Sequence, residues 1–237
     1  MTPTRPSDTY NPMYFLSSLG AGGLSVTFFM WLMFWVPHPG KTVPVFEDIQ
    51  AAFQAGSPLK QAMIAAAMAG IALFVLLNLK SLVWNLSRYS TWRHTEAFAA
   101  FSKTNAQSQL MAMPLALAMS VNGVFIAGLV FVPGLWAVVE YLFPVALAAF
   151  ILIAVLAFKL YGHFIARIKV EGGFNFAANN SFGQILPAFA FAMIGVGMAA
   201  PAAMSGNVAV VGTSIVVSTF LMVTAILIAG IALVLGI

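Results

Sequence analysis

Long apolar segments alternate with shorter polar ones along the chain after its first dozen residues. A helix needs about 20 apolar residues to cross the hydrocarbon core of a bilayer, and each apolar segment is close to that length or longer. The pattern therefore predicts an all-α integral membrane protein, with a polar tail over residues 1–12 and a transmembrane helical domain over residues 13–237. Six transmembrane helices are predicted: Met13–Val36, Gln61–Leu82, Gln109–Val132, Tyr141–Phe164, Phe182–Met204 and Val208–Gly236.

The polar connections between these spans differ in length. The connection over residues 37–58 is long and contains VFEDIQAAFQAG, whose composition predicts a short helix at the membrane interface. The connections over residues 133–140 and 205–207 are short enough to be tight turns. Tight turns join antiparallel helices, so we expect helical hairpins over about residues 13–86, 105–169 and 180–237.

The odd-numbered spans are irregular and the even-numbered spans are smooth. The irregular spans contain NPMYFLSSLGAGGLS, NAQSQLMAMPLALAMSVNG and NNSFGQILPAFAFAMIGVG, each with an Asn-containing polar start followed by small residues. This similarity predicts one helical hairpin repeated three times. Proline inside a helix bends it, and backbone groups freed in hydrocarbon must face protein or water. We therefore expect the odd spans at the centre and the aliphatic even spans against lipid, although small residues also serve close helix packing alone.

Composition supports a membrane protein, because 62% of the residues are hydrophobic and only 7% are charged. A soluble domain carries roughly 25% charged residues. The chain has no cysteine, which excludes disulfides, thiolate metal sites and cysteine nucleophiles. Its N-terminus lacks the apolar core and cleavage site of a signal peptide.

The positive charges are distributed unequally between the two sides of the predicted membrane. Cytoplasmic loops of membrane proteins are enriched in Lys and Arg, so the asymmetry predicts a cytoplasmic N-terminus. We expect a multi-pass protein of the cell membrane, such as the bacterial inner membrane, and the net charge of +4 does not indicate nucleic acid as a partner. On the N-terminal side lie Arg5, Lys80, Arg88, Arg93, Lys103, Lys159, Arg167 and Lys169, and on the other side lie Lys41 and Lys60.

Few residues offer chemistry for catalysis. The three histidines, His38, His94 and His163, do not form the facing pairs that a membrane haem needs, and no HExxH, Walker or GxGxxG motif is present. No charged residue lies near a predicted midplane, where proton relays and coupled transport place theirs. The sequence predicts neither an enzyme nor a cofactor or metal site.

The third and fifth spans carry the residues that best fit a lined pathway. Bends turn the positive ends of helix dipoles toward an anion, and an aromatic ring can block a narrow lumen. Asn122 is the leading polar candidate, although its amide could equally join two helices, and each ring could simply pack. The candidates are Pro114, Asn122, Gly123, Phe125, Pro187, Phe191, Gly195 and Gly197.

The segments QLMAMPLALAMSVNG and GQILPAFAFAMIGVG, with hairpin boundaries at Asn105 and Asn180, resemble the tellurite-resistance/dicarboxylate transporter family. That family includes the bacterial TehA proteins and the plant slow-type anion channels. The resemblance is one of architecture, and it implies five hairpins whose inner helices surround a pore occluded by a phenylalanine. This sequence has three hairpins, so we expect a shortened or incomplete member, and a complete chain would need to oligomerise to form a pore. The family's occluding phenylalanine lies on a later helix and corresponds to no residue here.

Two functions follow as hypotheses. The first is a membrane channel or passive transporter for small inorganic or organic anions. The second is a non-catalytic structural or assembly subunit of a membrane complex, such as a redox complex. The expected partners are the lipid bilayer, small anions, and either further copies of the chain or other subunits.

Overall fold

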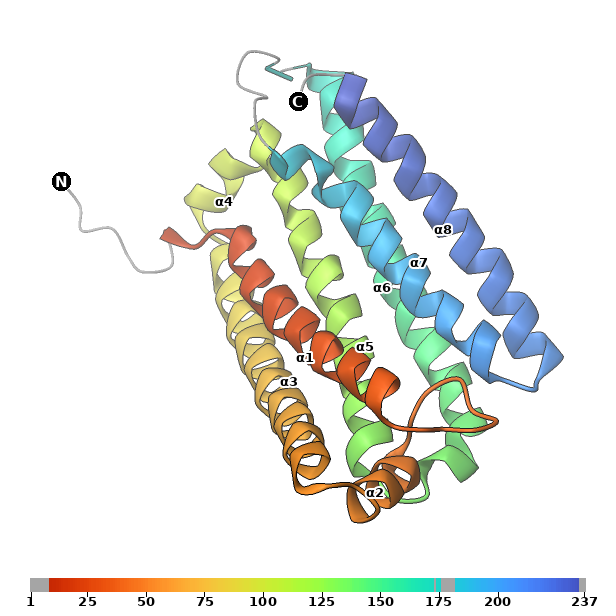
Figure 1. Cartoon of the computed structure of the whole chain (residues 1–237). Helices are drawn as coiled ribbons and strands as arrows, with labels where there is room; N and C mark the ends of the chain where they lie inside the picture. The colour runs from red at the N-terminus through yellow and green to blue at the C-terminus, as the bar shows by residue number, and fades with distance from the viewer. Residues whose placement is uncertain (1–8, 173, 176–181, 235–237) are drawn as a thin grey trace.

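The computed structural model describes residues 9–172, 174–175 and 182–234 (Figure 1). These residues form helices and include no strand. Six helices among them are long and apolar enough to cross a membrane, which confirms the predicted all-α fold with six spans. Arg5, Asn180 and Gly236, on which the predictions also drew, lie outside the described residues.

The helices follow one another with short connections. The 3-10 helices are η2 (Pro12–Tyr14), η3 (Asn105–Met111) and η4 (Phe182–Ile185), and the α-helices are α1 (Phe15–Trp35), α2 (Phe46–Gln54), α3 (Pro58–Trp92), α4 (Glu96–Phe101), α5 (Ala112–Phe131), α6 (Leu135–Glu171), α7 (Leu186–Met204) and α8 (Val208–Val234).

Two spans are longer than the sequence pattern predicted. The second and fourth were expected to end at Leu82 and Phe164, but α3 continues to Trp92 and α6 runs from Leu135 to Glu171. An α-helix satisfies its own backbone, and the long stems of Lys and Arg can reach water from its surface. Hydropathy therefore marks where the apolar part of a span stops, and the helix itself continues beyond that point.

The short helix predicted between the first two spans is present as α2, and two carboxylates hold it in place. Asp48 forms a salt bridge with Lys41, with an Nζ to Oδ1 distance of 2.8 Å, and accepts a hydrogen bond from the backbone N–H of Val45 at 3.1 Å. Glu47 accepts a 2.6 Å hydrogen bond from the backbone N–H of Gly134 in the turn between α5 and α6. Gly134 has a φ of 72°, which glycine adopts at little cost. The α2 helix is thus tied to the turn that starts α6.

Each odd-numbered span begins with a 3-10 helix: η2 precedes α1, η3 precedes α5 and η4 precedes α7. Pro187 lies in the first turn of α7, and Pro114 is the third residue of α5. The first N–H groups of an α-helix have no intrahelical partner, so a proline there removes little. The predicted fifth span, Phe182–Met204, placed Pro187 inside a helix that it would bend, and its position in the first turn of α7 shows that this prediction is wrong. The prolines inside helices are Pro144 in α6 and Pro201 in α7.

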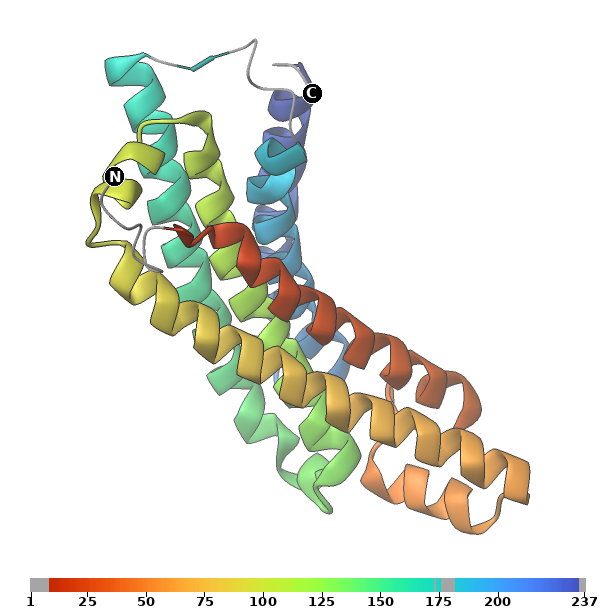
Figure 2. The ribbon, with the colours of Figure 1, turned by 90° about the vertical axis from the view of Figure 1, so that its left-hand side faces the viewer.

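Helices α1 and α3 lie side by side and are joined by polar groups (Figure 2). Asn78 donates from Nδ2 to the carbonyl of Ser18 at 2.7 Å, and the Ser18 hydroxyl donates to the carbonyl of Asn78 at 3.0 Å. One end of the pair is fixed by Asn85, which donates to the carbonyl of Tyr14 at 3.1 Å and accepts from the Tyr10 hydroxyl at 3.1 Å. We call Tyr10, Ser18, Asn78 and Asn85 the polar seam. It pairs polar atoms that lipid could not satisfy.

Helix α5 is the centre of the bundle. It contacts α1, α3, α6 and α7, whereas α8 packs mainly against α7 (Figure 1). In the most apolar 18-residue segment of each span, 50% of the residues are buried in the span of α5 and 56% in that of α7, against 22% in α8. The expected central position of the odd spans is confirmed for these two.

Helix α1 differs from that expectation. Its buried share is 33%, the same as that of α3. The reason is that α1 buries a single stripe of residues against α3 and α5, which leaves its other sides exposed. The stripe comprises Phe15, Ser18, Gly22, Ser25, Phe29 and Leu32.

The glycines of α1 provide a matched test of this packing. A Cβ on Gly22 would clash with the Met119 side chain and lie 2.9 Å from Nδ2 of Asn78, whereas a Cβ on Gly23 would meet no atom within 4 Å. We expect Gly22→Ala to lower the stability of the purified protein by about 1–3 kcal/mol, as overpacking does. Gly23→Ala, which changes helix propensity equally, should leave it unchanged or raise it. Thermal unfolding in detergent measures both, and equal behaviour of the two variants would contradict the packing described.

Candidate functional site

The starts of the odd helices meet at one end of the molecule, where η3 contacts both η2 and η4. The carbonyl of Asn105 accepts a 3.1 Å hydrogen bond from Nε2 of Gln184, which joins the start of α5 to the start of α7. The Asn105 side chain exchanges two further hydrogen bonds with the backbone of Asn175, at 2.9 and 3.2 Å. Asn105, predicted as a hairpin boundary, is the first residue of η3 and the centre of this contact.

An arginine from α6 fixes the same end of α5. Arg167 donates from Nε to Oε1 of Gln107 at 2.8 Å, and its two terminal nitrogens donate to the carbonyls of Lys103 and Thr104 at 3.2 and 3.0 Å. Because the planar guanidinium holds three acceptors at once, it constrains both the position and the direction of the chain entering η3.

Helix α5 presents two different faces along its length. Val124 is 50% exposed and lines a cavity on the side of α3 and α6. Asn122 precedes Val124 by two residues, so at 3.6 residues per turn its side chain points about 200° away. It points toward α7, where its Nδ2 lies 3.9 Å from Sδ of Met193.

The environment of Asn122 does not satisfy its amide. A primary amide has two N–H donors and an acceptor oxygen, and a thioether sulfur is a weak acceptor. The contact to Met193 is the one hydrogen bond of the Asn122 side chain within the described part of the chain, and the residue is half-buried. The group thus retains hydrogen-bonding capacity near the middle of a transmembrane helix.

Three of the predicted pathway residues lie together around a small cavity of about 30 Å³ between α5, α6 and α7. Asn122 and Phe125 line it from α5, and Gly197 lines it from α7. Phe125 stacks on Phe143 of α6 with ring centroids 6.0 Å apart. A Cβ on Gly197 would clash with the ring of Phe150, so this glycine makes room for an α6 aromatic side chain.

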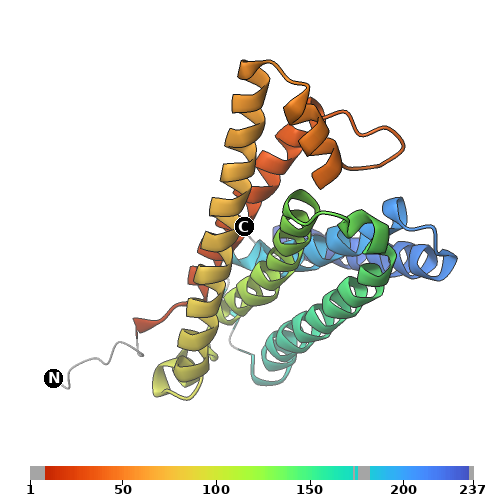
Figure 3. The same cartoon turned by 90° about the horizontal axis from the view of Figure 1, so that it is seen from below.

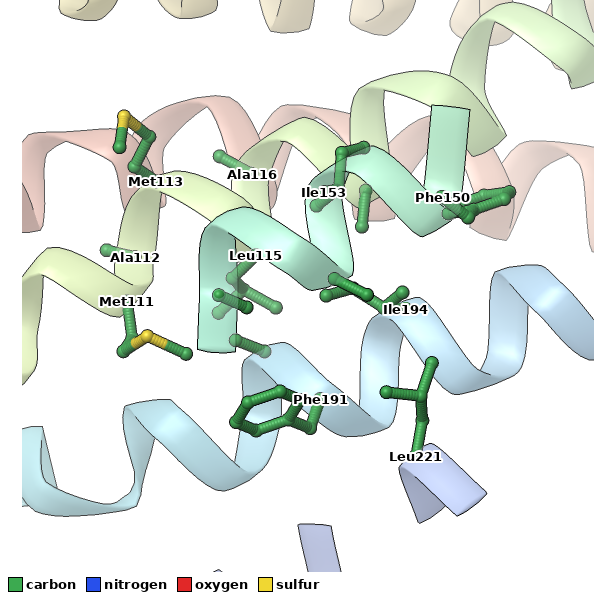
Figure 4. Packing of buried hydrophobic residues seen from close by; sticks show 14 of the residues in the cluster. Met111, Ala112, Met113, Leu115, Ala116, Phe150, Ile153, Phe191, Ile194 and Leu221 are labelled. Atoms are coloured by element: carbon green, nitrogen blue, oxygen red, sulfur yellow. The ribbon is translucent and has the colours of Figure 1, made fainter. Parts of the chain in front are cut away.

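The other predicted residues on α7 face α6 and α8. Phe191 is fully buried and packs against Phe158 and Tyr161 of α6, with centroid distances of 4.6 and 6.2 Å, and Figure 4 shows it beside Ile194 among the core residues. A Cβ on Gly195 would lie 3.2 Å from Met222 of α8, so this glycine serves helix packing. Pro187 lines a cavity of about 160 Å³ bounded by α6, α7 and α8.

The remaining two candidates lie on α5 itself. Gly123 faces α1 and α3, because a Cβ there would lie 3.7 Å from Oγ of Ser25 and 3.9 Å from Val75. Pro114 is buried in the first turn of α5. Within this one chain, the eight predicted residues therefore face several different helix interfaces and do not share one enclosed space.

A stripe on α7 was missed by the sequence reasoning. Phe189, Met193, Val196 and Ala200 follow one another at intervals of four, three and four residues, so they share a helix face. Met193 contacts Asn122, whereas Phe189 and Val196 are 58% and 57% exposed. The spacing of these four residues can be read from the sequence. The contact between Met193 and Asn122, which shows that this face of α7 lies beside α5, comes from the structure alone.

Comparisons with known proteins give no relative: no family model, curated protein or solved structure matches the chain.

In the described ranges, no three His, Asp or Glu side chains gather closely enough to hold a metal ion.

The arginine contact to η3 can be tested with two neighbouring basic residues. Arg167→Ala removes three hydrogen bonds at the entry of α5, and we expect it to lower stability in detergent by about 1 kcal/mol, because the group is partly exposed. Lys169→Ala removes the same charge from an exposed position on α6 and should have no measurable effect. Arg167→Lys keeps the charge without the planar fork and should resemble the alanine variant. A full rescue by lysine would show that charge alone matters.

Proposed function

We propose that the protein is a membrane channel or passive transporter for small anions, and that the path follows the surface of α5 between α1 and α7. The observation that carries the proposal is the half-buried amide of Asn122 near the middle of α5, with a single weak partner on α7.

An amide that lacks hydrogen bonds in hydrocarbon costs several kcal/mol. The position of Asn122 is therefore explained if its side chain meets water or a passing solute. Its N–H groups suit an anion, and an uncharged donor binds weakly enough to let the anion leave. Helices α1, α5 and α7 carry no charged residue, which fits passive conduction better than proton-coupled transport.

The proposed orientation places the N-terminus in the cytoplasm. Basic residues of the described chain concentrate at the end where α3 and α6 terminate, and Lys41 and Lys60 lie at the opposite end. This distribution follows the rule that cytoplasmic segments are rich in Lys and Arg. It also gives the cytoplasmic mouth a positive potential, which favours anions.

We include in the proposal the three repeated hairpins α1–α3, α5–α6 and α7–α8. Supporting it, each hairpin begins with a 3-10 helix, and its two long helices contact each other. The odd helices form a row in which α1 contacts α5 and α5 contacts α7. Helices arranged in a row can line only one side of the anion path. The other side is therefore formed by another copy of the chain or by another membrane protein.

Water access to Asn122 is directly testable because the chain contains no cysteine. A cysteine reacts with charged thiol reagents as the thiolate, which forms in water and not in lipid. We expect Asn122→Cys in intact membranes to be modified at least tenfold faster than Val124→Cys, whose side chain lies on the opposite face of α5 and is at least as exposed. Equal protection of both positions would exclude an aqueous path along this surface.

Flux through purified protein tests the function itself. Proteoliposomes should release chloride or nitrate faster than empty vesicles. We expect Asn122→Leu, which removes the amide at similar volume, to reduce the rate about tenfold, equivalent to about 1.4 kcal/mol. Gly23→Ala is the control, since its Cβ meets no atom. If folded wild-type protein conducts no anion and instead co-purifies with a stoichiometric partner, the structural-subunit hypothesis replaces this one.

A further inference from the structure

Helices α3 and α6 flank a cleft whose floor is the face of α5 that carries Val124. Figure 3 shows α5 between the two longer helices. The part of the cleft farther from the basic end is a cavity of about 480 Å³. It is lined by apolar side chains, including Leu82 of α3, Val124 of α5 and Leu142 of α6. Its one polar side chain, Ser120, donates to the carbonyl of Ala116 at 2.9 Å and is thus satisfied within its own helix.

A second cavity of about 440 Å³ lies at the basic end of the same three helices. Its lining residues include two basic ones, Arg93 at the C-cap of α3 and Lys159 on α6, and two that carry hydroxyl groups, Tyr89 and Ser90. No carboxylate lines it. Lys41–Asp48 is the one salt bridge within the described ranges, so neither cation is paired with an acid, although Nε of Arg93 donates to His94 at 3.1 Å.

The two cavities are successive compartments of one cleft. On each of the three helices, a residue that lines the apolar cavity lies one helical turn from a residue that lines the basic cavity. One turn is about 5 Å along the helix axis, so the compartments are adjacent along the membrane normal. The pairs are Leu82 and Leu86 on α3, Leu117 and Met113 on α5, and Ile153 and Leu156 on α6.

From this geometry we infer that the cleft between α3 and α6 binds one anionic phospholipid. Its phosphate lies between Arg93 and Lys159 with hydroxyl donors from Tyr89 and Ser90, and an acyl chain lies in the apolar compartment. An anionic head and an apolar tail joined end to end match a basic compartment joined to an apolar one. Basic pockets between transmembrane helices characteristically take acidic headgroups. The inference does not depend on anion conduction. The basic compartment lies at the end of the molecule proposed to be cytoplasmic, so placing the lipid in the cytoplasmic leaflet rests on that proposed orientation.

Native mass spectrometry of the detergent-solubilised protein tests the inference, with phosphatidylglycerol and phosphatidylcholine as probes. We expect one phosphatidylglycerol to be retained per chain and phosphatidylcholine to be lost. The double variant Arg93→Gln/Lys159→Gln should bind phosphatidylglycerol at least tenfold more weakly, since each basic group near a headgroup contributes measurably to binding. The matched control, Lys103→Gln/Lys169→Gln, removes two charges from the same end outside the cleft and should bind as the wild type does.

A second pair of variants tests the apolar compartment. Ala149→Phe fills the cavity from α6 and should abolish lipid retention, whereas Val155→Phe changes an exposed position on the same helix and should not. Circular dichroism and size-exclusion chromatography confirm that each variant is folded. Equal retention of both lipids, or equal loss in the two double variants, would overturn the inference. So would a change in oligomeric state with Ala149→Phe and no change in lipid retention, because the cleft would then be an interface between copies. Anion flux is measured separately and does not decide any of these outcomes.

Discussion

Hydrocarbon provides no hydrogen-bonding partner, so each polar group within the six spans needs one from the protein or from water. Most polar side chains here meet this requirement locally. Ser25 and Ser120 donate to carbonyls one turn earlier on their own helices, and Asn78 and Ser18 bond to each other across the polar seam. The exchange between Asn78 and Ser18 fixes how α1 lies against α3, and α1 in turn contacts the central helix α5.

Against this background, the amide of Asn122 is distinctive. Asn78 is buried and makes hydrogen bonds through Nδ2 to the backbone and hydroxyl of Ser18, although its Oδ1 has no partner among the described residues. Asn122 is more exposed, and among the described residues its amide nitrogen has the thioether sulfur of Met193 as its one partner. The two asparagines are chemically identical, so their surroundings assign them different roles: Asn78 joins helices, and Asn122 faces the proposed path.

The sequence predicted the parts of the fold that depend on hydropathy and failed where geometry decides. Apolar length identified all six spans, and the mixed composition of residues 45–56 identified α2, because burial of apolar surface sets both. The role of Pro187 was wrong, because a proline bends a helix only where the helix already extends before it, and here a 3-10 turn precedes α7. The directions of Gly195 and Gly197 could not be predicted either. They lie two residues apart, and only the positions of α6 and α8 show that Gly195 packs against Met222 and that Gly197 accommodates Phe150.

The lengths of α3 and α6 have a consequence for the surrounding bilayer. With 35 and 37 residues, these helices extend about 52 and 55 Å, well beyond a hydrocarbon core of about 30 Å. Figure 2 also shows the α1–α3 pair inclined to the other helices, so all spans cannot stand upright together. The polar ends of α3 and α6 therefore extend out of the hydrocarbon core, and a change in bilayer thickness is met by a change in helix tilt. Acyl chain length then becomes a variable that sets how the three helix pairs lean against one another.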